Sequence, residues 1–453
     1  MRSEALYYKH MHDTSQYPHL LEQMTEILAQ NDRGDYTQPG HGLYPHQWLW
    51  DSCFTAIGLA HIDVERAQRE LLSLLRGQWH NGMLPNIIFR PEPKYRTDRM
   101  IWRSWVNPNA PSDVATTGIT QPPMLAEAIV QIGDKLDWPE RRIWYARMWP
   151  ALLRHHEWLY RERDPHHEGL TLQIHPWETG LDNSPPWMNE MHDHLMPLWI
   201  RLIEKTKFDR LLGIFRRDTQ SVPSDERFST IEAITLFAAQ LRLRRKGYDI
   251  NKILDHGLFA IEDLSFNSIL IRANHHLRDI AHSLKQEIPA ELDEQMQRTE
   301  NVFDQLWDDY SGQYYSRDFI THRLLKISTV ATLLPLYAGH VSKTRAAQLV
   351  KLLEHEHGFG PAFAVPSVPI DSPWFRSKLY WQGPTWVNMN WLIIEGLKRY
   401  GYDEHAAALS ESTLEMVARS GASEYFDPLT GDGIGASGFS WTAALTIDLL
   451  KRS

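Results

Sequence analysis

The stretch YPHLLEQMTEILAQ at residues 17–30 shows the apolar pattern on which the predicted fold rests. Its apolar side chains recur three or four residues apart, which places them on one face of an α-helix. They are Leu20, Leu21, Met24, Ile27 and Leu28. The segment VERAQRELLSLLRG at 64–77 repeats this stripe and stops at a glycine. Both segments are therefore predicted to be amphipathic helices.

The helical period continues to the end of the chain, so the sequence predicts an all-α protein. Further helices are expected at 51–61, 121–136, 139–162, 189–206, 227–246, 252–286, 289–308, 327–338, 343–356, 384–400, 402–419 and 437–451. The span 252–286 is long, and we expect it to break near Asn267. Strand-like runs are short and lie at 86–89, 170–175 and 313–316. Because strands and helices do not alternate, a parallel sheet is not expected.

Long connections rich in Gly, Pro, Asn, Asp and Trp interrupt the helices. They lie at 31–50, 78–120, 164–188, 358–383 and 420–436. Loops longer than about 12–15 residues inside a compact domain are usually functional. No linker-like tract divides the chain, so we expect a single domain over 1–453 with these loops as insertions. A closed ring of paired helices, with the long loops at one end, fits this organisation best.

The composition excludes several classes of protein. The 453 residues include one cysteine, Cys53, which rules out an intramolecular disulfide and a four-cysteine zinc site. The formal net charge is −10, without basic blocks, so no nucleic-acid partner is expected. The start of the chain does not resemble a signal peptide, and no apolar run is long enough for a membrane span. We therefore expect a cytoplasmic protein without a membrane partner.

Tryptophan is unusually frequent, at 18 residues. One interpretation is that these rings fill the core. The other is that they line a cleft and offer flat apolar faces to a ligand such as a sugar ring.

A first candidate for chemistry is the loop PWETGLDNSPPW at 176–187, which contains Glu178 and Asp182 between two tryptophans. Partial desolvation against aromatic rings raises the pKa of a carboxylic acid and keeps it protonated, as a general acid requires. The alternative is a solvated loop in which the aspartate caps a helix.

A second candidate lies at 421–438, where Glu424 stands between small and aromatic residues and could form the second carboxylate of a pair. Asp427 and Asp432 are interpreted as turn formers. The sequence GIGASG at 433–438 matches the dinucleotide-binding pattern literally. No strand precedes it and only 15 residues follow it, so we reject that function. Its glycines are expected to let the chain turn tightly near a ligand.

Two further stretches contain candidate ligands. In YPHQWLWD at 44–51, Asp51 either caps the following helix or accepts hydrogen bonds from two sugar hydroxyls. In YWQGPTWVNMNW at 380–391, three side chains could form a wall and a hydroxyl ligand. They are Trp381, Gln382 and Trp386. The 23 histidines lack the spacing of a helical zinc site, and no phosphate-binding loop occurs, so neither a metal nor a cofactor is expected.

Taken together, the motifs QWLWD, WETGLDNSP, YWQGPTW and ASEYF resemble glycoside hydrolase family 63, and most of all its compact bacterial members. The resemblance covers nearly the whole chain in matching order. It implies an (α/α)6 barrel with the active site at the end that carries the long loops. It also implies an inverting mechanism, with Asp182 as general acid and Glu424 as general base.

The same resemblance implies which residues hold the sugar. Trp48, Trp50 and Asp51 would line the pocket for the released sugar, completed by Trp177, Tyr380, Trp381, Gln382 and Trp386. Tyr44 would lie near the leaving group, and the role of Glu178 stays open.

The sequence differs from the family pattern in the residues expected to bind the leaving group. Relatives specific for glycerate hold its carboxylate with Arg and Tyr side chains. Arg216 or Arg217 could supply the cation, but the stretch 218–230 contains no Tyr. We therefore expect an α-glucosidase acting on a small glucoside, with glycerate, glycerol or a second sugar as leaving group. The alternatives are a sugar isomerase or epimerase on a similar barrel and a noncatalytic sugar-binding protein. A homo-oligomer is left open.

Overall fold

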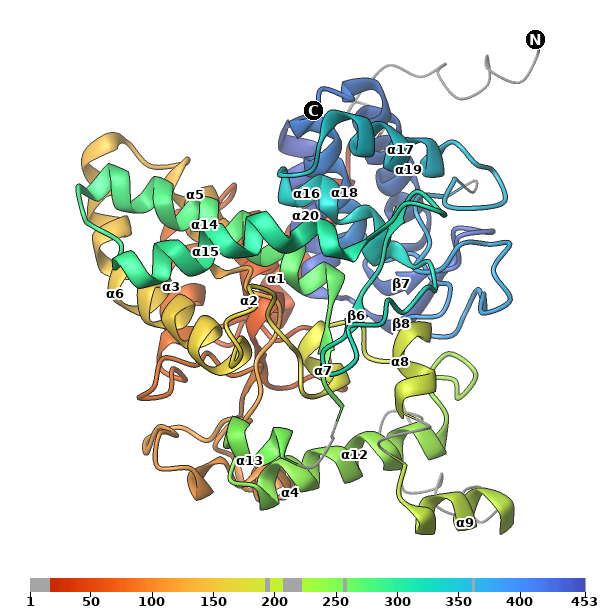
Figure 1. Cartoon of the computed structure of the whole chain (residues 1–453). Helices are drawn as coiled ribbons and strands as arrows, with labels where there is room; N and C mark the ends of the chain where they lie inside the picture. The colour runs from red at the N-terminus through yellow and green to blue at the C-terminus, as the bar shows by residue number, and fades with distance from the viewer. Residues whose placement is uncertain (1–16, 192–195, 207–221, 256–258, 361–362, 453) are drawn as a thin grey trace.

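The protein is described here from a computed structural model, which covers residues 17–191, 196–206, 222–255, 259–360 and 363–452. Among these residues, six helices contact one another in a closed ring (Figure 1). In order around the ring they are α2 (Leu49–Leu59), α5 (Leu125–Gly133), α14 (Leu264–Leu284), α16 (Pro335–Ala338), α18 (Val387–Arg399) and α20 (Ser440–Arg452). The contact between α20 and α2 closes the ring.

Each inner helix is covered by an outer helix that follows it in the sequence, except the last one, α20, whose outer helix lies at the other end of the chain. The outer helices are α3 (Val64–Leu75), α6 (Trp138–Arg163), α15 (Ala290–Val302), α17 (Lys343–Leu353), α19 (Asp403–Ser420) and, against α20, α1 (Leu20–Asn31). This arrangement is an (α/α)6 barrel and confirms the predicted fold class.

Inner helices are buried on nearly all sides, whereas outer helices are buried mainly on one face. Every residue of α2 is buried, whereas α3 buries one stripe that includes Ala67, Leu71 and Leu74. Inner helices also pack closely. A Cβ atom added at Gly58 would lie 2.3 Å from the backbone oxygen of Ala444, so only glycine lets α2 and α20 approach this far.

Most predicted helices are found with ends shifted by a few residues, and four predictions differ more. The span 189–206 is helical only at its start and over α9 among the described residues, 289–308 ends in a 3-10 turn and a strand, and 327–338 holds a 3-10 turn and the short α16. The span 252–286 does not break near Asn267. It breaks between α13 (Ile250–Leu254) and α14, where β3 (Ile261–Glu262) lies. Asn267 stays helical because its side chain is bound from outside the helix: its Oδ1 accepts the backbone N–H of Thr171 at 2.9 Å.

Short strands pair in four antiparallel two-stranded sheets among the described residues. The pairs are β1 (Gln47–Trp48) with β2 (Ile87–Ile88), β3 with β6 (Arg317–Asp318), β4 (Trp307–Asp308) with β5 (Gln313–Tyr314), and β7 (Ser423–Phe426) with β8 (Gly433–Ser437). The strand predictions at 86–89 and 313–316 are confirmed. The run 170–175 forms only an isolated bridge at Gln173, and the segment 420–436, predicted as a loop, contains β7 and part of β8.

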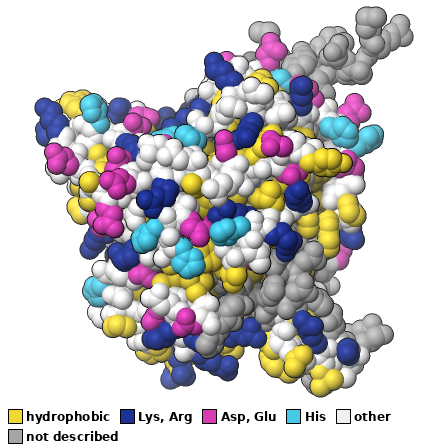
Figure 2. Space-filling view, in the orientation of Figure 1, with side chains coloured by type: hydrophobic (Ala, Val, Ile, Leu, Met, Phe, Trp, Pro, Cys, Tyr) yellow, Lys and Arg dark blue, Asp and Glu magenta, His cyan; other side chains and the backbone are white. Residues whose placement is uncertain are grey.

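A second group of helices lies together below the barrel in the view of Figure 1. It comprises α4 (Arg96–Trp102), α9 (Leu198–Thr206), α12 (Thr230–Arg245) and α13. Helix α9 exposes Leu198, Trp199 and Leu202, and apolar side chains are visible at this corner in Figure 2. No helix in the described ranges is both long and apolar enough to cross a membrane.

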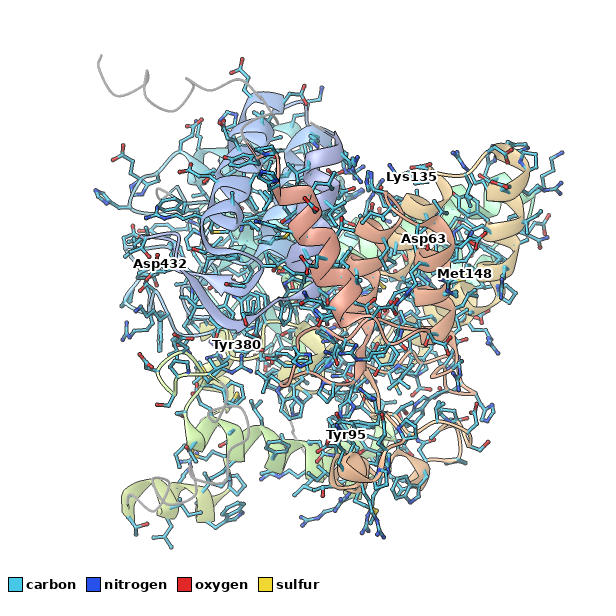
Figure 3. All side chains as sticks on the ribbon, turned by 180° about the vertical axis from the view of Figure 1, so that it is seen from behind. Asp63, Tyr95, Lys135, Met148, Tyr380 and Asp432 are labelled. Atoms are coloured by element: carbon cyan, nitrogen blue, oxygen red, sulfur yellow. The ribbon has the colours of Figure 1, made fainter. Side chains whose placement is uncertain are left out.

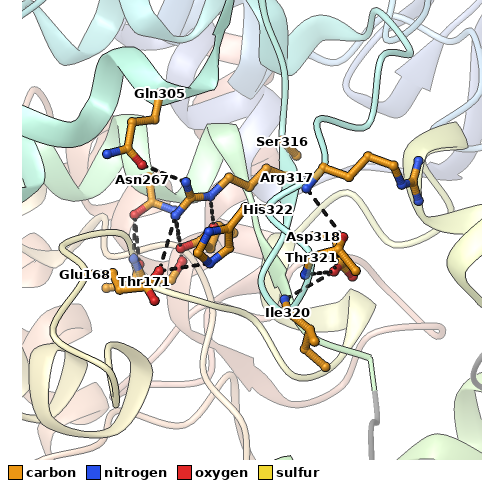
Figure 4. A network of polar contacts seen from close by, with 12 residues as sticks. Glu168, Thr171, Asn267, Gln305, Ser316, Arg317, Asp318, Ile320, Thr321 and His322 are labelled. Carbon is orange, nitrogen blue, oxygen red and sulfur yellow. Dashed lines mark hydrogen bonds and ion pairs between the residues drawn. The ribbon is translucent and has the colours of Figure 1, made fainter.

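A polar network fixes the segment that leads into the 176–187 loop (Figure 4). Arg317 forms an ion pair with Glu262, lies 3.6 Å from Glu168, and donates to Oε1 of Gln305 at 2.7 Å. His322 lies 3.1 Å from the same Glu168 carboxylate. The network therefore holds the 164–175 segment against β3 and β6.

Candidate active site

Three carboxyl groups from distant parts of the sequence converge at one site. Asp51 lies in the first turn of α2, Asp182 lies between α7 (Pro176–Thr179) and α8 (Pro185–Glu190), and Glu424 lies on β7. Burial raises the pKa of Asp51 well above its usual value, and the charges of Glu424 and Asp182 raise it further. The Tyr380 hydroxyl contacts Asp182, and the Arg227 guanidinium lies over the Tyr380 ring. Arg227 also pairs with Glu424, so these contacts join Asp182 and Glu424 in one cluster, which we call the carboxyl cluster together with Asp51.

Asp182 is held by its neighbours on both sides. The indole N–H of Trp187 donates to the carbonyl of Leu181 at 2.6 Å. The amide oxygen Oδ1 of Asn183 accepts the backbone N–H of Trp381 at 2.9 Å, and its carbonyl accepts Nε2 of Gln382 at 3.0 Å. These contacts dock the 176–187 loop on the 380–386 segment and fix the position of the acid.

The surroundings of Asp182 favour its protonated form. Its side chain keeps a partly exposed face, yet burial is the largest influence and raises its pKa from 3.8 to about 7. The negative charge of Glu424 raises the pKa further, while Arg227 and the Tyr380 hydroxyl, 3.4 Å from Oδ2, lower it. Tyr380 itself lies at the border between the C-terminal elements and the segment that contains α8 (Figure 3). At neutral pH a large fraction of Asp182 can therefore donate a proton.

Glu424 has the opposite surroundings, because hydrogen-bond donors compensate its negative charge. Its Oε1 accepts the Tyr44 hydroxyl at 2.7 Å and Nη1 of Arg227 at 3.1 Å. Its Oε2 accepts the backbone N–H of Ala436 from β8 at 3.0 Å. The side chain is 1% exposed, so these donors replace the water that a carboxylate would otherwise bind.

The β7–β8 hairpin depends on a glycine beside this carboxylate. Gly435 has φ +75°, and a Cβ atom there would lie 2.6 Å from the Tyr425 ring and 2.8 Å from Oε2 of Glu424. The glycine-rich 433–438 sequence thus forms an antiparallel strand and turn, which agrees with the rejection of a dinucleotide site.

Arg227 is the site residue that sequence reasoning missed. It is 4% exposed, its Nη2 donates to the Tyr44 hydroxyl at 2.7 Å, and its guanidinium lies 4.3 Å from the centre of the Tyr380 ring. The sequence analysis assigned the cation to Arg216 or Arg217, which lie outside the described residues. Arg227 precedes the capping box of Ser229 and Glu232 that begins α12, but nothing in the local sequence shows that it reaches Glu424.

The predicted aromatic wall is present and largely buried. Trp381 and Trp386 stack with ring centres 3.9 Å apart, and both are 1% exposed. Trp50 lies 6.4 Å from Trp381, measured between ring centres. These rings pack beneath the site and, being buried, offer little surface to a ligand. Gln382 is similarly engaged, since its amide binds the Asn183 carbonyl.

Two other predicted tryptophans are only partly buried. Trp48 is half-buried, and its indole N–H has no hydrogen-bond partner within the described structure. Trp177 packs against Trp102 and Phe237, at ring-centre distances of 6.0 and 5.5 Å, in the group of helices below the barrel.

Glu178, whose role the sequence left open, stabilises the start of the 176–187 loop. It is fully buried, pairs with Arg163 at 2.6 Å, and accepts the backbone N–H groups of Ile174 and Thr120 at 2.9 and 3.2 Å. Its carboxylate therefore ties the start of the 176–187 loop to the end of α6.

Comparison with known proteins gives a consistent result. Residues 44–442 match the family model described as "Mannosylglycerate hydrolase MGH1-like glycoside hydrolase domain". The chain is 39% identical to a mannosylglycerate hydrolase of Thermus thermophilus, over 93% of this chain and 98% of the relative. It is 31% identical to a glucosylglycerate hydrolase of Mycolicibacterium hassiacum, over 97% and 99% of the two chains.

The solved structures agree with the sequence comparison. A crystal structure of a family 63 mannosylglycerate hydrolase from Thermus thermophilus, in complex with Tris and D-glycerate, superposes with a TM-score of 0.85. The two chains are 37% identical, and the match covers 96% of this chain and all of the other.

Proposed function

Since the chain belongs to the MGH1-like glycoside hydrolases of family 63, we propose that Asp182 and Glu424 are the acid and the base with which it hydrolyses a small α-glycoside. Family membership makes the protein an inverting glycosidase, which sets aside the isomerase and the noncatalytic alternatives. The observation that carries the assignment is the contrast between the two carboxyl groups. Burial raises the pKa of Asp182 to about 7, so a large fraction carries a proton at neutral pH, while Arg227 and Tyr44 compensate the charge of Glu424.

The mechanism follows from these two environments. Asp182 gives its proton to the glycosidic oxygen as the bond from that oxygen to the anomeric carbon breaks. Glu424 takes a proton from a water molecule that attacks the anomeric carbon from the opposite face. An inverting pair stands about 6.5–9.5 Å apart to leave room for this water. The products are a free leaving group and a sugar of inverted anomeric configuration.

Asp51 has a binding role in this proposal. It is 5% exposed, and the charges of Glu424 and Asp182 both raise its pKa, so we assign it to the part of the sugar nearest the reacting bond. A carboxyl group can form hydrogen bonds with two adjacent hydroxyls through its two oxygens. Trp48, with its unpartnered indole N–H, is a second hydroxyl ligand in this pocket.

The leaving group we propose is glycerate. The sequence argued against it because 218–230 contains no Tyr, but tyrosines reach the site from elsewhere: Tyr44 and Tyr380 both contact Arg227. Relatives named as glycerate-releasing enzymes support the same choice.

The sugar we propose first is mannose, and glucose second. The sequence analysis favoured glucose. Relatives named mannosylglycerate hydrolase are 36–39% identical to the chain, against 31% for the one named glucosylglycerate hydrolase. Mannose and glucose differ only in the configuration at C2, so their ranking is a question for kinetics.

The test is product analysis by proton NMR on four α-glycosides: mannosylglycerate, glucosylglycerate, mannosylglycerol and glucosylglycerol. We expect the highest kcat/KM for mannosylglycerate and the β-anomer of mannose as the first product. Early α-anomer would contradict inversion, and a preference for the glycerol compounds would contradict glycerate as the leaving group. The variant Asp182→Asn serves as the inactive control.

A further inference from the structure

A cluster of metal-ligand side chains lies in a part of the barrel that contributes nothing to the carboxyl cluster. His275 is on α14, Glu300 is on α15, and His340 is in the connection between α16 and α17. One ligand atom from each lies within 4.8 Å of the other two. Helices α15 and α16 both contact α14, which brings the three segments together (Figure 1). We propose that these side chains bind a divalent transition-metal ion of the Zn²⁺ type.

The donor set and its geometry suit such an ion. Two imidazoles and one carboxylate are ligands that Zn²⁺ commonly takes, at bond lengths of about 2.0–2.2 Å. Two ligand atoms on one tetrahedral ion then stand about 3.4 Å apart. The distance from Nε2 of His275 to Oε1 of Glu300 is 3.2 Å, close to that value. His340 is exposed, so water can occupy the fourth position.

The carboxylate is ready to act as a ligand. Glu300 is buried, and its Oε1 is contacted by His275 at 3.2 Å and by Arg278 at 2.7 Å, so this oxygen points into the cluster. To bind the ion, His275 must present the lone pair of Nε2, so its ring proton moves to Nδ1.

Arg278 is the group that competes with the ion. Its Nη1 donates to Oε1 of Glu300 at 2.7 Å, the same oxygen that His275 contacts. Its Nε already contacts Asp293 at 2.9 Å, so the guanidinium has a second carboxylate to which it can turn. Metal binding and the Arg278–Glu300 ion pair are therefore alternatives, and weakening the ion pair should strengthen the binding of the metal.

The ion would join three segments of the barrel and take no part in hydrolysis. The ligands are separated by 300 − 275 = 25 and 340 − 300 = 40 residues, so no local spacing motif reveals them. A metal that binds only the folded chain stabilises it by mass action. Zn²⁺ should therefore raise the midpoint of thermal unfolding without changing kcat.

The experiment is a titration of the full chain, freed of metal by a chelator, with Zn²⁺ by calorimetry and with Co²⁺ by visible absorption. We expect one ion per chain and an intense tetrahedral Co²⁺ spectrum. His340→Ala and His275→Ala should each weaken binding at least about tenfold. Arg278→Gln should strengthen it. The matched control is His282→Ala, an exposed histidine on the same helix outside the cluster, which should bind as the wild type does.

Three results would overturn the proposal: absence of stoichiometric binding, unchanged affinity in His340→Ala, or an equal loss in His282→Ala. His340 is exposed, so its replacement leaves the fold intact even if His275→Ala does not fold. Because hydrolysis and metal binding are measured separately, failure of one assignment leaves the other standing.

Discussion

Replacing the proposed acid should sharply lower turnover and at the same time stabilise the protein at neutral pH. In Asp182→Asn the group that gives its proton to the leaving oxygen is lost, which should lower kcat by about 10²–10⁴-fold. A substrate whose leaving group needs no proton, such as α-mannosyl fluoride, should be hydrolysed nearly as fast as by the wild type. This rescue separates loss of the acid from loss of the pocket.

The size of the stability effect follows from the pKa of Asp182, which folding raises from 3.8 to about 7. Between these values the folded protein holds a proton that the unfolded chain has released. The free energy of unfolding therefore falls as pH rises, by about 1.4 kcal/mol per pH unit, and levels off above pH 7. Asparagine cannot ionise and escapes this penalty. From pH 5 to pH 8 the variant should gain about 3 kcal/mol relative to the wild type.

The assay is guanidinium unfolding of both proteins at pH 5 and pH 8, together with the pH profile of kcat for the wild type. The profile should fall about tenfold per pH unit above pH 7, because only protonated Asp182 is active. Asn183→Asp at the next position is not a suitable control, since Asn183 docks the loop. Glu226→Gln is a better control, because Glu226 is less buried than Asp182. Its carboxylate accepts the backbone N–H of Gly435 in the β7–β8 hairpin. A stability difference that does not change with pH would refute the reasoning.

Three further predictions concern the support of the site. Arg227→Met should reduce the free energy of unfolding by about 3–5 kcal/mol, because Glu424 is left as an unpaired buried charge, and Arg227→Lys should recover part of it in denaturant titrations. Gly435→Ala should lower both stability and kcat through backbone strain and the clash with Glu424. Gly401→Ala, at φ +78° in open space, should show only strain of about 1–2 kcal/mol and unchanged kcat, so equal effects would contradict the clash. Glu178→Gln should destabilise the fold by breaking the pair with Arg163, while the pH profile of the remaining activity keeps its midpoint; a shifted midpoint would give Glu178 a part in the chemistry.

The helices were accessible from sequence because their signals are local. The stripe in 17–30 predicts α1, and the one in 64–77 predicts α3 nearly to its ends. The break expected near Asn267 was wrong because the contact that keeps this part of the chain helical is not local. A buried polar side chain inside a helix is unfavourable only if it lacks a hydrogen-bond partner. Asn267 finds one in the backbone of Thr171, which lies nearly a hundred residues earlier in the sequence.

The candidate acid and base were also visible in sequence, because each lies in a loop with a distinctive composition and the motifs around them resemble one family. Their electrostatic partners were not visible. Tyr44 and Arg227 reach Glu424 from 380 and 197 residues away. No local pattern marks such contacts, since they arise only when the ring has closed.

Local sequence patterns were therefore enough to predict a mainly helical chain, its amphipathic helices, the loops between them and the carboxyl groups that those loops contain. All of these depend on residues within a few positions of one another. Only the tertiary structure decided that α20 packs on α2, that Arg227 rather than a residue chosen from the sequence contacts Glu424, and that His275, Glu300 and His340 meet. Burial and charge at a point in space depend on every segment that reaches it, and those segments are far apart along the chain.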